Sequence, residues 1–106
     1  MTTVEFFNEE GRVQGFCCSG HSGYAEAGAD IVCASVTTAV QFATATIVDV
    51  MGERATVKVD EDARITFRLP AKCENEDAVQ DILCGMMNTL LWLREQYPDY
   101  IEVLEV

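Results

Sequence analysis

Apolar and polar positions in the first half of the chain follow a strand pattern and then a helix pattern. Two β-rich runs, Thr3–Phe7 and Arg12–Cys18, flank the turn-forming segment Asn8–Gly11, which is typical of a β-hairpin in which Gly11 adopts a positive φ angle. From Ile31 to Met51, apolar residues recur at intervals of three and four, and this spacing predicts one buried face of a long helix. The positions on that face are Val32, Val36, Val40, Ala43, Ile47 and Met51.

The next segment alternates again and predicts a second hairpin. Ala55–Asp60 and Ala63–Leu69 are separated by the polar turn Asp60–Asp62, and Pro70 ends the second strand. The alternation places Val57, Val59, Ile65, Phe67 and Leu69 on one side of the hairpin and Lys58, Arg64 and Arg68 on the other.

A second helix is predicted from Glu76 to Tyr97. Asn75 is the expected N-cap, and Pro98 marks the end of the helix. The apolar stripe consists of Val79, Leu83, Met86, Leu90, Leu93 and Tyr97. Ile101–Val106 is expected to add a short last strand.

These elements follow the order ββαββαβ, which predicts one domain over residues 1–106. We expect an α+β fold of two layers, with a mostly antiparallel sheet and both helices on one face of it. Of the 106 residues, 49% are hydrophobic, and this share is sufficient for a core without disulfides.

Charge narrows the choice of partners. The chain has 18 acidic and 7 basic side chains, giving a formal charge of −11. Phosphates would be repelled, so direct binding to nucleic acid or to an anionic membrane is not expected. A cationic partner is favoured, although acidic residues that serve only solubility would explain the same net charge.

The N-terminus and the cysteines indicate a cytoplasmic protein. The start of the chain has neither a basic segment nor an apolar run before Asn8, so no signal peptide is expected. Polar residues interrupt the longest apolar segments, so no membrane span is expected either. The five cysteines are an odd number, which favours reduced thiols. They are Cys17, Cys18, Cys33, Cys73 and Cys84.

Candidate chemistry lies around the single histidine, His21. It is in the loop Ser19–Asp30, which contains Gly20, Gly23 and Gly28. If Asp30 is the N-cap of the following helix, Cys33 is its third residue, where unpaired N–H groups and the helix dipole favour a thiolate. The N–H groups of Ile31–Ala34 could also stabilise an oxyanion, so the arrangement suits a Cys/His nucleophilic site.

Plainer interpretations of the same residues remain open. His21 is explained equally by a solvated surface position, Cys33 by a small buried side chain, and Asp30 by helix capping alone. A zinc site from Cys17, Cys18, His21 and Cys33 is disfavoured, because adjacent strand residues point to opposite faces of a sheet. We therefore expect no metal or other cofactor, and interpret Cys73 and Cys84 as structural.

Two linked motifs decide between these alternatives. The segments Gly20–Ala25 (GHSGYA) and Gly28–Ala34 (GADIVCA) closely resemble the GHxGYA and GxDIVCA motifs of the ribosomal-processing cysteine protease family. The resemblance extends over essentially the whole chain, and the two motifs together are much more specific than either residue alone.

The resemblance implies a His21–Cys33 catalytic dyad in a commonly dimeric α+β protein. Its substrate would be a large-subunit ribosomal protein, cut after a Phe and before a small residue to remove a short N-terminal extension. Gly20 and Asp30 correspond to motif positions, and the mobile substrate segment corresponds to 22–29, including Ser22, Gly23, Tyr24 and Gly28. The chain departs from the family at Thr37, where members often carry Ser four residues after the nucleophile. Ser35 is the nearest serine.

Two hypotheses of other classes accompany the protease. An acidic adaptor that docks on a basic ribosomal protein explains the charge but not the position of Cys33. A metal-binding or redox domain predicts bound zinc or iron.

Overall fold

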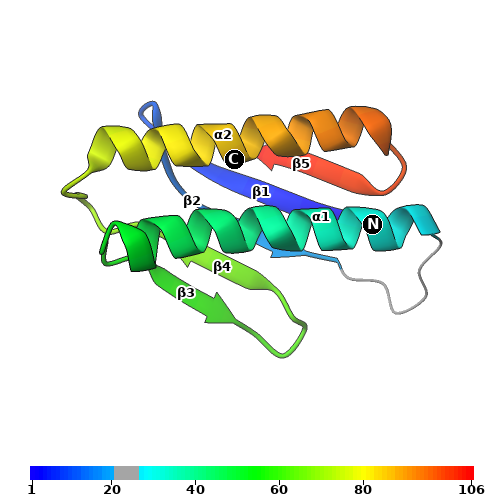
Figure 1. Cartoon of the computed structure of the whole chain (residues 1–106), viewed down its shortest axis with the longest axis horizontal. Helices are drawn as coiled ribbons and strands as arrows, with labels where there is room; N and C mark the ends of the chain where they lie inside the picture. The colour runs from blue at the N-terminus through cyan, green and yellow to red at the C-terminus, as the bar shows by residue number, and fades with distance from the viewer. Residues whose placement is uncertain (21–26) are drawn as a thin grey trace.

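The computed structural model describes the backbone of residues 1–20 and 27–106, and the side chains of 1–20 and 30–106. Its elements follow the predicted order, which is thereby confirmed (Figure 1). They are β1 (Thr2–Glu9), β2 (Arg12–Ser19), α1 (Ala27–Thr44), the π-helical turn η1 (Ala45–Val50), β3 (Thr56–Val59), β4 (Ile65–Arg68), α2 (Glu76–Gln96) and β5 (Ile101–Glu105).

The strands described form one five-stranded sheet in the order β3-β4-β2-β1-β5. All neighbouring pairs are antiparallel except β1 and β5, which run parallel. The mostly antiparallel sheet is therefore confirmed. The first hairpin closes through Glu10 at φ 52° and Gly11 at φ 79°, as the turn sequence predicts.

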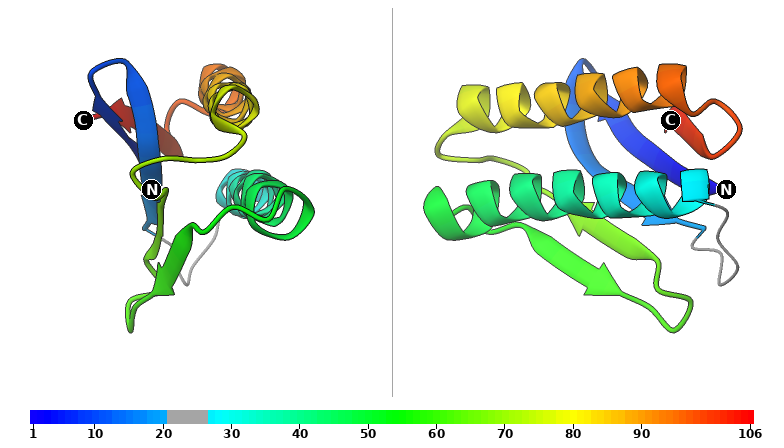
Figure 2. Two further views of the ribbon diagram at one scale, coloured as in Figure 1. Left: turned by 90° about the vertical axis from the view of Figure 1, so that its left-hand side faces the viewer. Right: turned by 45° about the vertical axis from the view of Figure 1, so that its right-hand side comes forward.

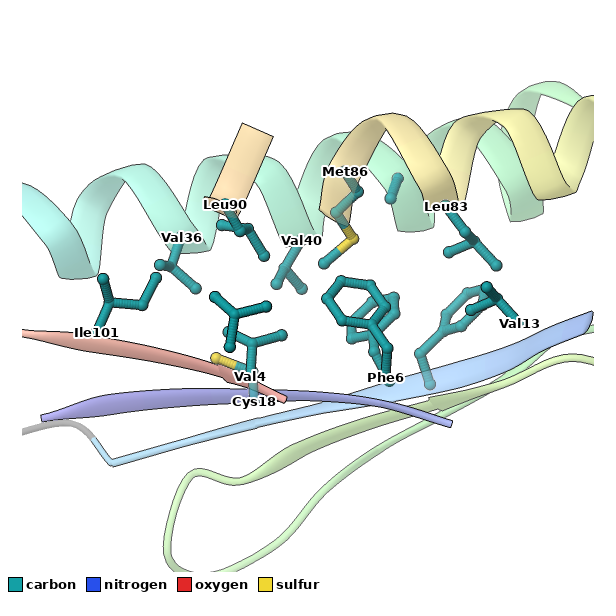
Figure 3. Packing of buried hydrophobic residues seen from close by; sticks show 14 of the residues in the cluster. Val4, Phe6, Val13, Cys18, Val36, Val40, Leu83, Met86, Leu90 and Ile101 are labelled. Atoms are coloured by element: carbon teal, nitrogen blue, oxygen red, sulfur yellow. The ribbon is translucent and has the colours of Figure 1, made fainter. Parts of the chain in front are cut away.

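Both helices cover the same face of the sheet (Figure 2). The core lies between the two layers, where side chains from both helices meet those of the strands (Figure 3). The predicted stripes are confirmed as buried at Val32, Val36, Val40, Ala43 and Ile47 in the first helix, and at Val79, Leu83, Met86 and Leu90 in the second. Amphipathic periodicity thus identified the helix faces correctly.

The first helix begins earlier than the pattern predicted. Its first residue is Ala27 rather than Ile31, so Gly28 lies in the first helical turn and not in the expected substrate loop. Alanine has the highest helix propensity, and a single glycine near a helix end is tolerated. The apolar stripe alone did not reveal this first turn, because the stripe starts only at Val32.

One helical segment meets the length and composition expected of a membrane span, contrary to the sequence expectation. Asp30–Val50 has a mean hydropathy of 1.7. In the structure one side of this segment packs on the sheet through Val32, Val36 and Ile47, so it serves as a core helix here.

The second hairpin has the predicted inner face but shorter strands. Val57 lies opposite Phe67, and Val59 lies opposite Ile65, so these side chains share the inner face of the sheet. Phe67 is fully buried, whereas Val57 is 44% and Val59 67% exposed. The difference arises because the hairpin extends past α1, and β3 is the outermost strand (Figure 2).

The N-terminus of α2 is capped differently from the prediction. Asn75 is at the N-cap position, but its side chain makes no capping hydrogen bond. Instead the buried carboxylate of Glu53 accepts hydrogen bonds from the backbone N–H groups of Glu74 (3.1 Å) and Asn75 (2.9 Å). A residue more than 20 positions away therefore supplies acceptors for N–H groups at the start of the helix.

Candidate active site

Cys33 is the seventh residue of α1 and lies in its second turn. Its side chain is half-buried. Helical spacing places it on the same flank of α1 as Val40 and Thr44, which line a groove shared with β3 and β4. The predicted position in the first turn was wrong, because the helix starts at Ala27. Asp30 is likewise not an N-cap but an exposed acidic residue of the first turn, where its charge complements the helix dipole.

The longer helix also changes the expected oxyanion site. In a helix that starts at Ala27, the N–H groups of the first three residues, 27–29, have no intrahelical partners. The N–H groups of Ile31–Ala34 are engaged in the helix, so the prediction that they form an oxyanion hole was wrong.

Cys18 is a buried residue of β2 close to Cys33. It is 2% exposed on the inner face of β2, and Figure 3 shows it within the core. Burial, with smaller contributions from the charges of Cys17 and Cys33, raises the pKa of Cys18 to about 11. Cys18 is thus held as a neutral thiol near Cys33.

Cys17 points to the opposite face of the sheet, as alternation predicts. Its sulfur lies 3.6 Å from the hydroxyl oxygen of Thr66 in β4. Because Cys17 and Cys18 diverge, they do not form a shared ligand set. Across the part of the chain that the structure describes, no three His, Cys, Asp or Glu side chains are placed to hold a metal ion.

Gly20 follows the last residue of β2, and the structure explains why a glycine is needed there. Its φ angle is 90°, and a Cβ atom at this position would collide with the carbonyl oxygen of Met1. A residue without a side chain is therefore required where the chain leaves the sheet. This places the first glycine of the motif beside the N-terminus.

The remaining predicted site residues divide into two groups. His21, Ser22, Gly23 and Tyr24 lie outside the described residues. Thr37 is half-buried one turn after Cys33, on the same flank of α1.

Ser35 points elsewhere, into a groove of about 570 Å³ between α1 and α2. Of the two hydroxyl residues near Cys33, only Thr37 therefore shares its flank.

Comparison with known proteins gives a consistent family. The family described as "Cysteine protease Prp" matches residues 1–102 of the chain. A ribosomal processing cysteine protease Prp from Staphylococcus aureus is 30% identical over 104 residues, covering 97% of each chain.

Solved structures are similar over their full length. The chain matches the S. aureus Prp protease in complex with a substrate peptide with a TM-score of 0.87 at 28% identity, covering 100% of both chains. It matches the same protease with a covalently linked product peptide with a TM-score of 0.83 at 28% identity. Since the family covers nearly the whole sequence and the relative covers 97% of it, the chain belongs to the Prp cysteine protease family and is a cysteine protease.

Proposed function

We propose that the protein removes a short N-terminal extension from a large-subunit ribosomal protein, with Cys33 as nucleophile and His21 as general base and acid. The observation that carries the proposal is a half-buried cysteine on a core helix, within a GxDIVCA motif that follows a GHxGYA motif. A relative named for ribosomal processing, similar over 97% of the chain, supports the substrate class.

The chemistry needs only these two side chains and water. His21 accepts the thiol proton, and the sulfur of Cys33 attacks the carbonyl carbon of the Phe residue, forming a tetrahedral intermediate. His21 then protonates the leaving amine of the small residue that follows, which leaves a thioester. Water deprotonated by His21 hydrolyses the thioester and regenerates the thiol.

Supporting roles fall to residues around the dyad. Gly20 allows the chain to turn at the end of β2, Asp30 places a negative charge at the positive end of α1, and Thr37 offers a hydroxyl one turn from Cys33. We assign Ser22, Gly23 and Tyr24 to the segment that admits the substrate. The protein acts in the cytoplasm, where its thiols stay reduced.

A nucleophile variant tests the proposal directly. The probe is a ribosomal-protein peptide with its N-terminal extension and one Phe–Ala bond, and cleavage is followed by mass spectrometry. We expect Cys33→Ala to abolish cleavage, because no thiolate remains, and Cys33→Ser to retain a trace at most. Cys84→Ala removes an exposed cysteine of α2 and should cleave normally. Cleavage by purified Cys33→Ala would mean that another residue is the nucleophile, whereas no cleavage by the parent protein would leave the acidic adaptor as the explanation.

We also propose that the protein is a homodimer, formed through the groove between α1 and α2. Small and apolar residues line this groove, including Ala34, Ala39 and Met86. Phe42 at its edge is 68% exposed, and Trp92 on α2 is 66% exposed. Large exposed aromatic side chains beside an apolar groove are typical of a protein interface.

Sedimentation equilibrium tests the dimer. The parent should sediment at twice the chain mass of 11.7 kDa, and Phe42→Glu should shift it to the monomer by placing a charge in the interface. Val106→Glu adds the same charge at the C-terminus and serves as the control. A monomeric parent, or a dimeric Phe42→Glu protein, contradicts this interface.

A further inference from the structure

A second groove lies on the other flank of α1, between that helix and the β3–β4 hairpin. Its volume is about 340 Å³, and its walls are formed by side chains from both layers. They include Val40, Thr44 and Val48 on the helical side, and Val57, Val59 and Ile65 on the strands.

The groove exists because the sheet is wider than the helical layer. Val57 and Val59 face inward but remain 44% and 67% exposed. Among the described strands, β3 pairs only with β4, so its outer backbone edge is open to another strand. An open edge beside exposed apolar side chains is a template for an extended peptide, whose backbone pairs with the edge while alternate side chains fill the groove.

The groove lies on the same flank of α1 as Cys33. Cys33, Thr37, Val40, Thr44 and Val48 follow one another at intervals of three and four, which places them along one side of the helix. The groove is therefore continuous with the flank that carries the proposed nucleophile, and it lies opposite to the groove between α1 and α2.

Helix geometry gives the distance between Cys33 and the groove. Val40 and Thr44 are seven and eleven residues beyond Cys33. With a rise of about 1.5 Å per residue, this part of the groove lies about 10 to 17 Å from Cys33 along the helix axis. An extended peptide advances about 3.3 Å per residue, so it would reach the groove about three to five residues from the bond at Cys33.

The sheet gives a second, independent measure. Val59 lies opposite Ile65, and Ile65 lies opposite Cys18, the buried thiol near Cys33. Neighbouring strands are about 4.8 Å apart, so this row covers about 10 Å. The Val59 end of β3 is thus also about three peptide residues from the site.

We infer that the groove between α1 and the β3–β4 hairpin is a secondary substrate subsite. It takes apolar side chains three and five residues from the cleaved bond, while the substrate backbone pairs with β3. The inference rests on the proposed function, because the occupant is the extended segment of the protease's own substrate. Asp49 at the groove suits a substrate rich in basic residues.

Two synthetic peptides with one Phe–Ala bond test the subsite. The long peptide carries six residues on each side of the bond, with Val at the third and fifth positions on both sides. The short peptide carries two residues on each side. In the Val59→Lys protein, we expect kcat/KM for the long peptide to fall at least tenfold, mainly through KM, and that for the short peptide to stay within twofold of the parent.

Matched variants make the result specific. Val57→Lys should act like Val59→Lys, while Val106→Lys adds the same charge to an exposed valine outside the groove and should change neither peptide. In a Cys33→Ala background, Val59→Lys should weaken binding of the labelled long peptide, measured by fluorescence anisotropy, at least tenfold.

Three outcomes overturn the subsite: equal kcat/KM for the long peptide in parent and Val59→Lys, an equal loss on both peptides, or unchanged binding in the Cys33→Ala background. If the parent cleaves neither peptide, the proposed function itself fails, and the anisotropy measurement still decides whether the long peptide occupies the groove.

Discussion

Cys18 and Cys33 show how two cysteines in one region acquire different properties. Cys18 sits in the core below α1, and burial, together with the charges of Cys17 and Cys33, raises its pKa to about 11. Cys33 lies on the helix flank and is half-buried, so reagents and substrates reach it more readily. The difference comes from position in the fold, since both residues are thiols of the same intrinsic chemistry.

The raised pKa of Cys18 predicts a loss of stability at alkaline pH. In the unfolded chain this thiol titrates near 9.0, and in the folded protein near 11. Between these values the unfolded state binds fewer protons, so the free energy of unfolding falls as pH rises, by about 2 to 3 kcal/mol in total. Below pH 9.0 the contribution is complete.

Urea unfolding at pH 8.5 and pH 10.5 measures this effect. The decrease in the free energy of unfolding from the lower to the higher pH should be smaller by about 2 kcal/mol in Cys18→Val than in the parent, because the titrating thiol is gone. Cys84→Val, which replaces an exposed cysteine, should show the decline of the parent. Parallel pH profiles for the parent and Cys18→Val would rule out this assignment.

At the scale of elements, contacts between distant segments hold α2 against the sheet. Arg12 of β2 donates hydrogen bonds to both carboxylate oxygens of Glu76 and to the carbonyl oxygen of Pro70. The Arg12 guanidinium lowers the pKa of the Glu76 carboxyl. Gln80 uses its side-chain amide to donate to the carbonyl of Val13 and to accept from its N–H, both at 2.8 Å. The start of α2 is therefore fixed to the β1–β2 hairpin.

Substitution of Glu53 tests these contacts between distant elements most directly. Glu53 is 7% exposed, and its two oxygens accept the N–H groups of Glu74 and Asn75. We expect Glu53→Ala to lower the free energy of unfolding by about 2 kcal/mol, because two donors lose their acceptors. Glu53→Gln keeps one oxygen and should lose about half as much. The measurement is urea denaturation followed by circular dichroism.

Glu74→Ala serves as the control for that experiment, because it removes an exposed carboxylate at the same helix end. A Glu53→Ala protein as stable as the Glu74→Ala protein would show that the cap contributes nothing.

At the scale of the whole molecule, the net charge bears on the proposed substrate. A formal charge of −11 favours approach of a basic protein, such as the proposed ribosomal substrate, and repels phosphates. At about 0.1 M salt the screening length is about 10 Å, so this attraction weakens at higher ionic strength.

The expected result is a fall in kcat/KM of about fivefold or more between about 20 mM and about 500 mM salt for a basic substrate. An uncharged peptide with the same Phe–Ala bond should show little change. The comparison is made at limiting substrate concentration, and equal salt dependence for both peptides would mean that charge does not steer the substrate.

Local patterns predicted the element order well, and they failed where a boundary or a contact depends on something outside the pattern. The apolar stripe of the first predicted helix correctly identified Val32 to Ile47 as its buried face, but it contains no information on the turn from Ala27, whose residues lie before the stripe. That turn moved Cys33 from the first helical turn to the second. The motif residues were found from sequence, while their position in the helix was not.

By itself, the sequence determined the α+β order, the buried faces of both helices and the two motifs with Cys33, because strand and helix periods and motif spacing are local properties of a chain. Only the tertiary structure decided that Glu53 caps α2, that Cys18 is the buried thiol near Cys33, and that Val57 and Val59 line an open groove. These depend on which segments become neighbours, and alternation along one strand cannot say whether a helix covers it. The net negative charge follows from composition, but the apolar groove between α1 and the β3–β4 hairpin became visible only in the fold.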